Sequence, residues 1–95
     1  MYTIYVVFDC LPDMREAFVQ RVKAEGILDE ILNEDGCYGY DYYFSESDPN
    51  QLLLIERWET KQHQQVHIGQ PHMAKLMALK EDYVRSTTLG EFHLD

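Results

Sequence analysis

Basic residues are scarce in this sequence. It carries 8 lysine and arginine residues against 17 aspartate and glutamate residues, so its formal net charge is −9 at pH 7 over 95 residues. Phosphate groups are repelled by such a chain, and no stripe of lysine or arginine offsets the repulsion. The composition therefore argues against nucleic acid and against anionic membrane surfaces as partners.

Long apolar runs, the sequence features of a signal peptide and closely spaced cysteine pairs are also missing. No apolar run approaches the roughly 20 residues that a membrane-spanning helix needs. Residues 1–10 lack the basic start and small-residue cleavage site of a signal peptide. Cys10 and Cys37 stand alone, without CxxC spacing. We therefore expect a cytoplasmic chain with two free thiols.

The most informative stretch is residues 36–58, GCYGYDYYFSESDPNQLLLIERW. Aromatic residues at every second position predict a strand over residues 37–44, with four aromatic side chains on one face: Tyr38, Tyr40, Tyr42 and Phe44. Turn-forming residues follow, and residues 51–59 form a second strand-like apolar run. This pattern predicts an antiparallel hairpin whose aromatic face either belongs to the core or lines a pocket.

The rest of the chain completes a β-α-β-β-α-β order. Residues 2–8 predict a strand with two largely apolar faces, and residues 14–32 a helix that Asp13 and Glu16 cap and Gly26 weakens. Thr60 is placed to cap a short helix over residues 61–68, and Pro71 to start another over residues 72–83. Residues 86–94 predict the last strand. The order indicates one α+β domain over residues 1–95, ferredoxin-like with a four-stranded antiparallel sheet.

Helices cover one face of such a sheet and leave the other face open. Here the open face would be apolar and aromatic, larger than a soluble monomer usually tolerates. We therefore expect a homodimer in which a second copy packs sheet to sheet about a two-fold axis.

Several motifs together resemble one known family. They are Pro-Asp at 12–13, GCYGYDYY at 36–43, Asp-Pro at 48–49, LLLIERWE at 52–59, a histidine at 67 and QPHM at 70–73. The pattern resembles the antibiotic biosynthesis monooxygenase (ABM) domain, a group of dimeric α+β barrels that includes quinol monooxygenases. The resemblance implies a pocket between sheet and helices in each subunit. It also implies oxygenation of a small phenol or hydroquinone by O₂ without flavin, metal or haem.

In that chemistry the substrate loses a proton, and its anion then passes an electron to O₂. The protein must bind the substrate, exclude water and assist the proton transfer. His67 is the first candidate for the base, because histidine titrates near neutral pH and the family places a histidine there. His72 at a helix start and Asp41 on the hairpin are further catalytic candidates. Each candidate also has a simpler interpretation. The histidines would be ordinary residues at helix ends, and Asp41 would form a surface ion pair with Arg57.

Aromatic residues supply the candidate substrate contacts. Trp58 stands where the family usually has tryptophan, and would stack on a flat substrate or simply fill the core. Tyr5, Tyr40 and Tyr42 would offer hydroxyl groups, or would pack at the dimer interface. His63 and His67 lie four residues apart, but no HExxH or CxxC motif accompanies them. We therefore expect no metal site and no cofactor.

Two other functions remain open from the sequence. One is an isomerase or lyase in which His67 shuttles protons, and the other is a non-catalytic barrel that binds a small ligand or responds to stress. A phosphorylated substrate is disfavoured, because the basic residues are scattered and no glycine-rich phosphate cradle is present.

The expected homodimer gives a first test. Light scattering at micromolar protein concentration should return twice the chain mass of 11.3 kDa, because the open sheet face would be covered by a second copy. A clean monomer would contradict this architecture.

Overall fold

The alternating side chains of β1 (Tyr2–Cys10) divide the molecule into two faces. In the computed structural model, which describes residues 1–92, Ile4, Val6 and Phe8 are buried beneath the helices. Tyr5 and Val7 point to the opposite face and remain partly exposed. A period of two therefore separates the core from the open face, as the sequence predicts for a strand.

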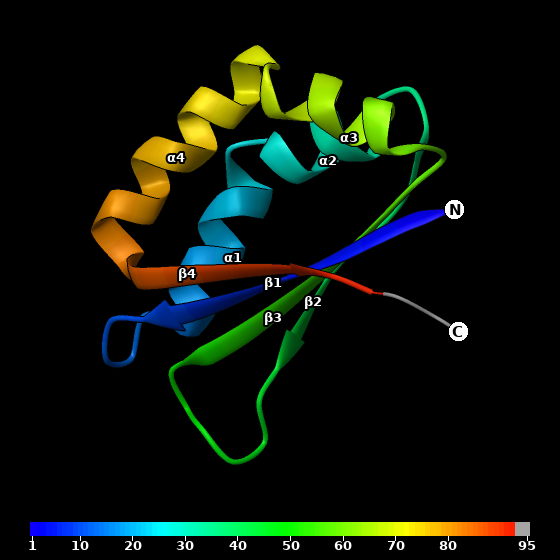
Figure 1. Ribbon diagram of the computed structural model, residues 1–95. Helices are drawn as coiled ribbons and strands as arrows, with labels where there is room; N and C mark the ends of the chain where they lie inside the picture. The colour runs from blue at the N-terminus through cyan, green and yellow to red at the C-terminus, as the bar shows by residue number, and fades with distance from the viewer. Residues whose placement is uncertain (93–95) are drawn as a thin grey trace.

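The other elements follow the predicted order around this central strand. They are α1 (Arg15–Ala24), α2 (Ile27–Leu32), β2 (Cys37–Phe44), β3 (Gln51–Trp58), α3 (Lys61–Ile68), α4 (Pro71–Tyr83) and β4 (Val84–Glu91). The sheet order is β2-β3-β1-β4, and every neighbouring pair is antiparallel. The helices all lie on one side of the sheet (Figure 1). The predicted ferredoxin-like α+β fold is confirmed. The last strand begins two residues earlier than predicted, and residues 93–95 lie outside the described part of the chain.

The main core fills the space between the sheet and the helices. Phe18 of α1 stands edge-on to Phe8, with ring centroids 5.7 Å apart, and Leu76 packs down from α4. Burying each such side chain stabilises the fold by roughly 1.5–3 kcal/mol. The sheet contributes Leu52, Leu54 and Trp58, and the helices contribute Val22, Ile27 and Ile31.

The single helix predicted over residues 14–32 is two helices. α1 ends at Ala24, and Gly26 adopts a left-handed φ of 76° before α2 begins. Glycine adopts that conformation without the steric cost that other residues carry, so the chain turns there instead of bending. The predicted Asp13 cap is also wrong. Asp13 itself has a φ of 64°, and α1 starts without a side-chain cap.

The predicted row of four aromatic side chains on β2 is also wrong at one position. The ladder between β2 and β3 shifts register between Cys37 and Gly39, which is a β-bulge. Cys37 therefore takes the inward position opposite Trp58, and Tyr38 is turned out to solvent with 57% of its surface exposed. Tyr40 and Tyr42 keep the predicted inward direction.

Arg15 ties α1 to the tip of the hairpin. Its Nη1 donates to the backbone carbonyls of Ser45, Asp48 and Gln51 at 3.1, 2.9 and 3.2 Å. Its guanidinium also lies over the ring of Phe44, 4.5 Å from the centroid. The hairpin turn is therefore fixed by a side chain about 30 residues earlier in the chain.

Gly36, the residue before β2, is subject to two constraints. Its φ is 79°, and a Cβ placed on it would meet the ring of His63 at 2.4 Å. Its carbonyl accepts the Glu59 N–H at 2.8 Å, which closes the entry to the hairpin. A glycine is thus required by backbone conformation and by space.

Gly36→Ala should therefore destabilise the protein by about 2 kcal/mol or more, measured by urea unfolding. Gly69→Ala is the matched control. A Cβ at Gly69 meets only one backbone oxygen at 3.7 Å, so that variant should stay within about 1 kcal/mol of the wild type. Equal stability of the two variants would contradict the steric argument.

Candidate functional site

Two helix boundaries bring His67 and His72 together. Thr60 caps α3 as predicted, with its hydroxyl oxygen accepting the His63 N–H at 3.3 Å. α3 ends at Ile68 with Gly69 as its C-cap, and Pro71 is the first residue of α4, where its missing N–H is not needed. His67 therefore lies in the last turn of α3 and His72 in the first turn of α4. The sharp break between the two helices lets both imidazoles face the same point.

That point is one carboxylate oxygen of Glu34. Its Oε2 lies 2.6 Å from His67 Nδ1 and 2.9 Å from His72 Nε2. Only 9% of the Glu34 side chain and 2% of the His67 side chain are exposed. Because an ionised carboxylate only accepts hydrogen bonds, both nitrogens donate to it. Glu34 therefore leaves Nε2 of a neutral His67 without its proton.

The free nitrogen of His67 faces the sheet. His67 Nε2 lies 3.8 Å from Oε1 of Glu56, and the same oxygen accepts the indole N–H of Trp58 at 3.0 Å. The Trp58 and His67 rings stack with centroids 4.6 Å apart, and the Tyr40 ring meets His67 edge-on at 5.8 Å. His67 is thus held between two carboxyl groups and two aromatic rings.

Burial sets the protonation states in this cluster. It lowers the pKa of His67, which favours the neutral imidazole, although the hydrogen bond to Glu34 acts the other way. Burial raises the pKa of Glu56 to about 7, although the Trp58 hydrogen bond opposes the rise. Burial also raises the pKa of Tyr40 well above its usual value. A neutral imidazole with a bare nitrogen is a suitable proton acceptor.

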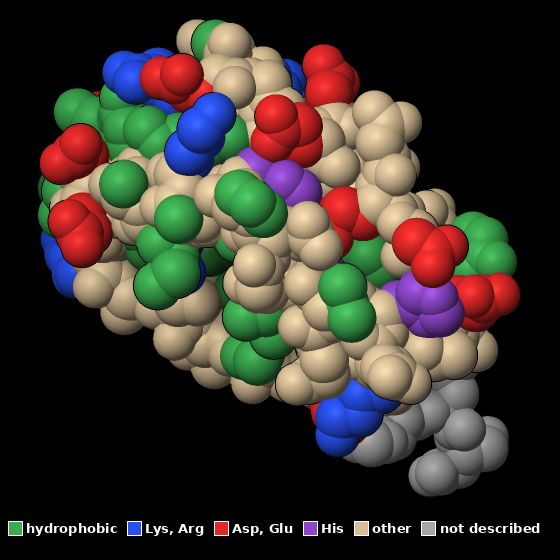
Figure 2. Space-filling model, turned by 90° about the horizontal axis from the view of Figure 1, so that it is seen from above, with side chains coloured by type: hydrophobic (Ala, Val, Ile, Leu, Met, Phe, Trp, Pro, Cys, Tyr) green, Lys and Arg blue, Asp and Glu red, His purple; other side chains and the backbone are tan. Residues whose placement is uncertain are grey.

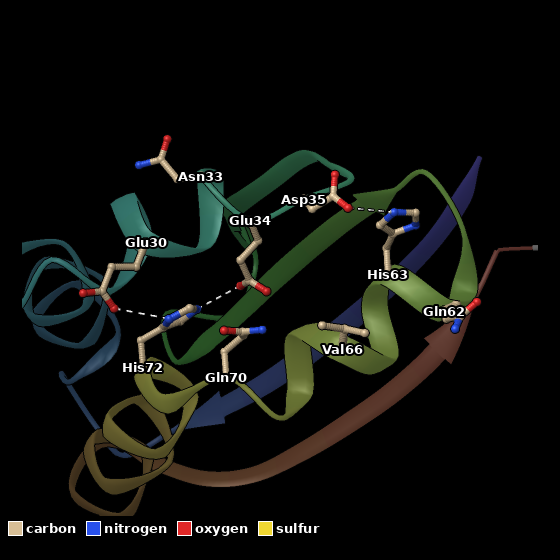
Figure 3. Close-up of a pocket in the computed structure, with 9 residues that line it drawn as sticks. All are labelled: Glu30, Asn33, Glu34, Asp35, Gln62, His63, Val66, Gln70 and His72. Carbon is tan, nitrogen blue, oxygen red and sulfur yellow. Dashed lines mark hydrogen bonds and ion pairs between the residues drawn. The ribbon is translucent and has the colours of Figure 1, made fainter.

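A cavity of about 610 Å³ opens on the outer side of this cluster. Nine residues line it: Glu30, Asn33, Glu34, Asp35, Gln62, His63, Val66, Gln70 and His72. Figure 3 shows His72 between Glu30 and Glu34, and His63 beside Asp35. Viewed from the helix side, the histidines reach the surface in two places, each next to acidic side chains (Figure 2). The cavity is acidic, and its lining includes no lysine or arginine.

A second cavity of about 510 Å³ lies against the β2 edge of the sheet. Its walls are aromatic and aliphatic, with Lys23 and Asp41 as the charged members: Val19, Lys23, Leu28, Tyr40, Asp41, Tyr42, Tyr43 and Phe44. Tyr42 Oη is buried and makes no hydrogen bond of good geometry among residues 1–92, although its interaction with the Tyr40 hydroxyl affects the pKa of both groups. Neither cavity is lined by His67 or Trp58.

The structure gathers some of the predicted site residues and separates others. Trp58, His67, His72 and Tyr40 belong to one buried cluster, with Tyr42 beside it. Tyr5 lies on the opposite face of the sheet, where its ring contacts Phe92. Asp41 points away from His67. Its carboxylate pairs with Arg57 at 3.2 Å, which is the surface ion pair given above as the alternative to a catalytic role.

Glu34 and Glu56 belong to this cluster, although sequence reasoning did not identify them. Glu56 had a signal, because it shares the alternation of Leu52, Leu54 and Trp58, all of which face the helices. A carboxylate at an inward position of a central strand is rare unless it is paired. Glu34 follows the end of α2 in an irregular segment, where no periodicity fixes the direction of a side chain.

The fold agrees with the family comparison. A family model described as antibiotic biosynthesis monooxygenase matches residues 1–79. The chain belongs to this family, and several solved structures that it resembles carry the same family name.

None of the helices described over residues 1–92 is both long and apolar enough to cross a bilayer.

Two relatives show how far the sequence similarity extends. The chain is 33% identical over 55 residues to an Escherichia coli K12 protein named "Probable quinol monooxygenase YgiN", covering 50% of this chain and 53% of that protein. It is 36% identical over 61 residues to Rv0793 of Mycobacterium tuberculosis, covering 64% and 57% respectively. The chain thus spans about half the length of the curated relatives that it matches.

Solved structures extend the similarity over the whole fold. The structure of Rv0793 matches with a TM-score of 0.79 and 27% identity, covering 99% of this chain and 95% of that one. PA3566 from Pseudomonas aeruginosa matches with a TM-score of 0.82, covering 98% of this chain and 92% of that one. At 18% identity the second likeness shows the fold alone.

The buried carboxyl of Glu56 gives a pH-dependent prediction. Its pKa is about 7 in the folded chain and 4.5 ordinarily, so folding favours the protonated form. The buried carboxylate therefore lowers the free energy of unfolding. This destabilisation is absent below about pH 4.5, grows as the pH rises towards 7 and is complete above 7. Glu56→Gln mimics the protonated carboxyl and keeps an oxygen for the Trp58 N–H. It should therefore stabilise the protein at pH 8 by up to about 3 kcal/mol and leave stability nearly unchanged at pH 4.5.

Urea unfolding in EDTA-containing buffer at the two pH values measures this difference. Glu46→Gln, at an exposed position of the hairpin turn, is the control and should change stability little at either pH. A Glu56→Gln variant no more stable than the wild type at pH 8 would show that the carboxylate is accommodated without strain.

Proposed function

We propose that this protein is an oxygenase that oxidises a small phenol or hydroquinone with O₂, and that His67 removes the substrate proton. The observation that carries the proposal is the Glu34–His67 pair, joined at 2.6 Å in a buried setting. The carboxylate fixes the tautomer, so the proton-free Nε2 faces the interior of the fold. The same logic orients the imidazole in other enzymes that use a carboxylate–histidine pair.

The family supports the reaction class. The chain belongs to the antibiotic biosynthesis monooxygenase family, and one relative is named as a probable quinol monooxygenase. In this chemistry an electron-rich anion supplies the electron to O₂, so the residues of the protein bind the substrate, exclude water and hold the proton. No cofactor is part of this proposal.

The aromatic cavity at the β2 edge is the better place for such a substrate. Its volume of about 510 Å³ suits a small aromatic ring system. Tyr40 and Tyr42 offer flat faces, and in this proposal the buried Tyr42 hydroxyl bonds a substrate oxygen. The larger cavity is acidic, which also disfavours the phosphorylated substrate of the isomerase alternative.

Tyr40 stands between this cavity and the proposed base. It lines the cavity, and its ring also meets His67 with centroids 5.8 Å apart. A substrate proton therefore reaches His67 either through the Tyr40 hydroxyl or after the ring has swung aside. Trp58 holds the other side of the imidazole by stacking and keeps water from it.

The homodimer is part of the same proposal. The face of the sheet away from the helices presents partly exposed apolar side chains: Tyr5, Val7, Leu53 and Ile55. A second copy that packs on this face would bury them and leave the helix-side cluster intact. Tyr5 would then serve the interface and not the substrate.

Replacing the base tests the mechanism. His67→Ala should lower the turnover of a hydroquinone by 10²–10⁴-fold, measured as oxygen consumption at neutral pH, because a general base contributes about that much. The loss should shrink at high pH, where solvent hydroxide ionises the phenol. His63→Ala is the control, since His63 lies on the same helix but contacts Asp35 and Glu59 instead. Full activity of His67→Ala between pH 6 and 9 would remove His67 as the base.

Replacing Tyr40 separates the two proton routes. Tyr40→Phe keeps the ring but removes the hydroxyl. If the hydroxyl passes the proton, kcat should fall by at least about 10²-fold, as for loss of the base. If the ring only moves aside, kcat should stay within a few-fold of the wild type. A rise in KM with unchanged kcat would instead assign the hydroxyl to substrate binding.

A further inference from the structure

We infer that Glu34, His67 and His72 form a site for one divalent first-row transition metal ion of the Zn²⁺ type. Their facing ligand atoms, Glu34 Oε2, His67 Nδ1 and His72 Nε2, all lie within 4.8 Å of one another. Two histidines and one carboxylate form a recognised donor set for zinc and for related ions. The inference can be tested without substrate, so its outcome is separate from that of the proposed oxygenase activity.

The distances fit an ion after a small adjustment. Ligand atoms of a tetrahedral zinc site lie about 3.3 Å apart, given metal–ligand bonds of about 2.0–2.2 Å. Here Glu34 Oε2 lies 2.6 Å from one histidine nitrogen and 2.9 Å from the other. Moving each pair apart by less than an ångström makes room for an ion where two protons now lie.

Each histidine also has a carboxylate behind it. His72 Nδ1 lies 3.3 Å from Oε2 of Glu30, and His67 Nε2 lies 3.8 Å from Oε1 of Glu56. Metal-bound histidines usually donate their other N–H to a carboxylate. On metal binding, the proton of each imidazole would move to the nitrogen that faces Glu30 or Glu56. The site would thus accept the ion by a change of tautomer in each ring.

Charge and access favour the ion as well. Over residues 1–92, no lysine or arginine pairs with Glu30 or Glu34, so the negative charge of these two carboxylates lacks a lysine or arginine partner. Glu34 and His72 line the cavity of about 610 Å³, which gives an ion and its water ligands a route from solvent. Figure 3 shows Glu34 and His72 facing each other at this cavity. An ion held by the three protein ligands would therefore have coordination positions open on the cavity side.

The site would also bear on the proposed base. A metal on Nδ1 leaves the His67 proton on Nε2, the nitrogen that would otherwise take up the substrate proton. The metal-loaded and metal-free forms then present opposite proton states to Glu56 and Tyr40. Occupancy would oppose the base function.

Metal titration without substrate tests the inference. After treatment with EDTA and desalting, the protein is titrated with Zn²⁺ by calorimetry and with Co²⁺ by visible absorption. We expect one ion per chain and a tetrahedral or five-coordinate Co²⁺ spectrum. Mg²⁺, which prefers oxygen ligands, should bind far more weakly.

Variants assign the site. Glu34→Gln and His72→Asn should each weaken Zn²⁺ binding at least 100-fold, and Glu30→Gln should weaken it 10–100-fold. The control is His63→Asn, because His63 also lies near two carboxylates, Asp35 and Glu59, but outside the cluster. It should keep wild-type affinity. Circular dichroism checks that each variant is folded. If His72→Asn does not fold, the assignment of the site is made with Glu34→Gln alone. The inference is overturned if the wild type does not bind Zn²⁺. It is also overturned if His63→Asn abolishes binding while folded Glu34→Gln and His72→Asn keep it.

Discussion

One carboxylate oxygen holds the helical layer of this molecule in register. Glu34 follows α2, and its Oε2 receives hydrogen bonds from a histidine at the end of α3 and from another at the start of α4. Burying a carboxylate without hydrogen-bond partners would destabilise the fold, and so would burying two imidazoles without partners. The three groups satisfy one another, so each of the three segments is fixed relative to the other two.

The same contact sets the chemistry on the sheet side. Because Nδ1 of His67 is committed to Glu34, Nε2 is turned towards Glu56, Trp58 and Tyr40. Burial favours the uncharged forms of His67 and Glu56. Burial thus limits the charge that these two groups carry near neutral pH, beside the carboxylate of Glu34.

Much of this was predictable from the sequence because periodicity fixes the direction of side chains in regular elements. The strand alternation placed Trp58 and Tyr40 inward, and the helix signals at Thr60 and Pro71 set the positions of both histidines. The same alternation should have excluded Asp41, which lies between two inward tyrosines. The bulge at Tyr38 was not predictable, since an extra residue in one strand leaves no mark on the pattern. Glu34 lies in an irregular segment, where only the fold decides its contacts.

The hydrogen bonds from Arg15 to the hairpin tip have a consequence for how the chain folds. Two strands joined by a short turn usually form early, because their contacts are local. Here three carbonyls of the turn depend on a guanidinium that belongs to α1. The turn also has hydrogen bonds of its own, from the Asp48 N–H to Ser45 Oγ and from the Asn50 N–H to Asp48 Oδ1. We therefore expect the turn to form locally and to lose its remaining mobility when α1 docks, through a contact made across a third of the chain.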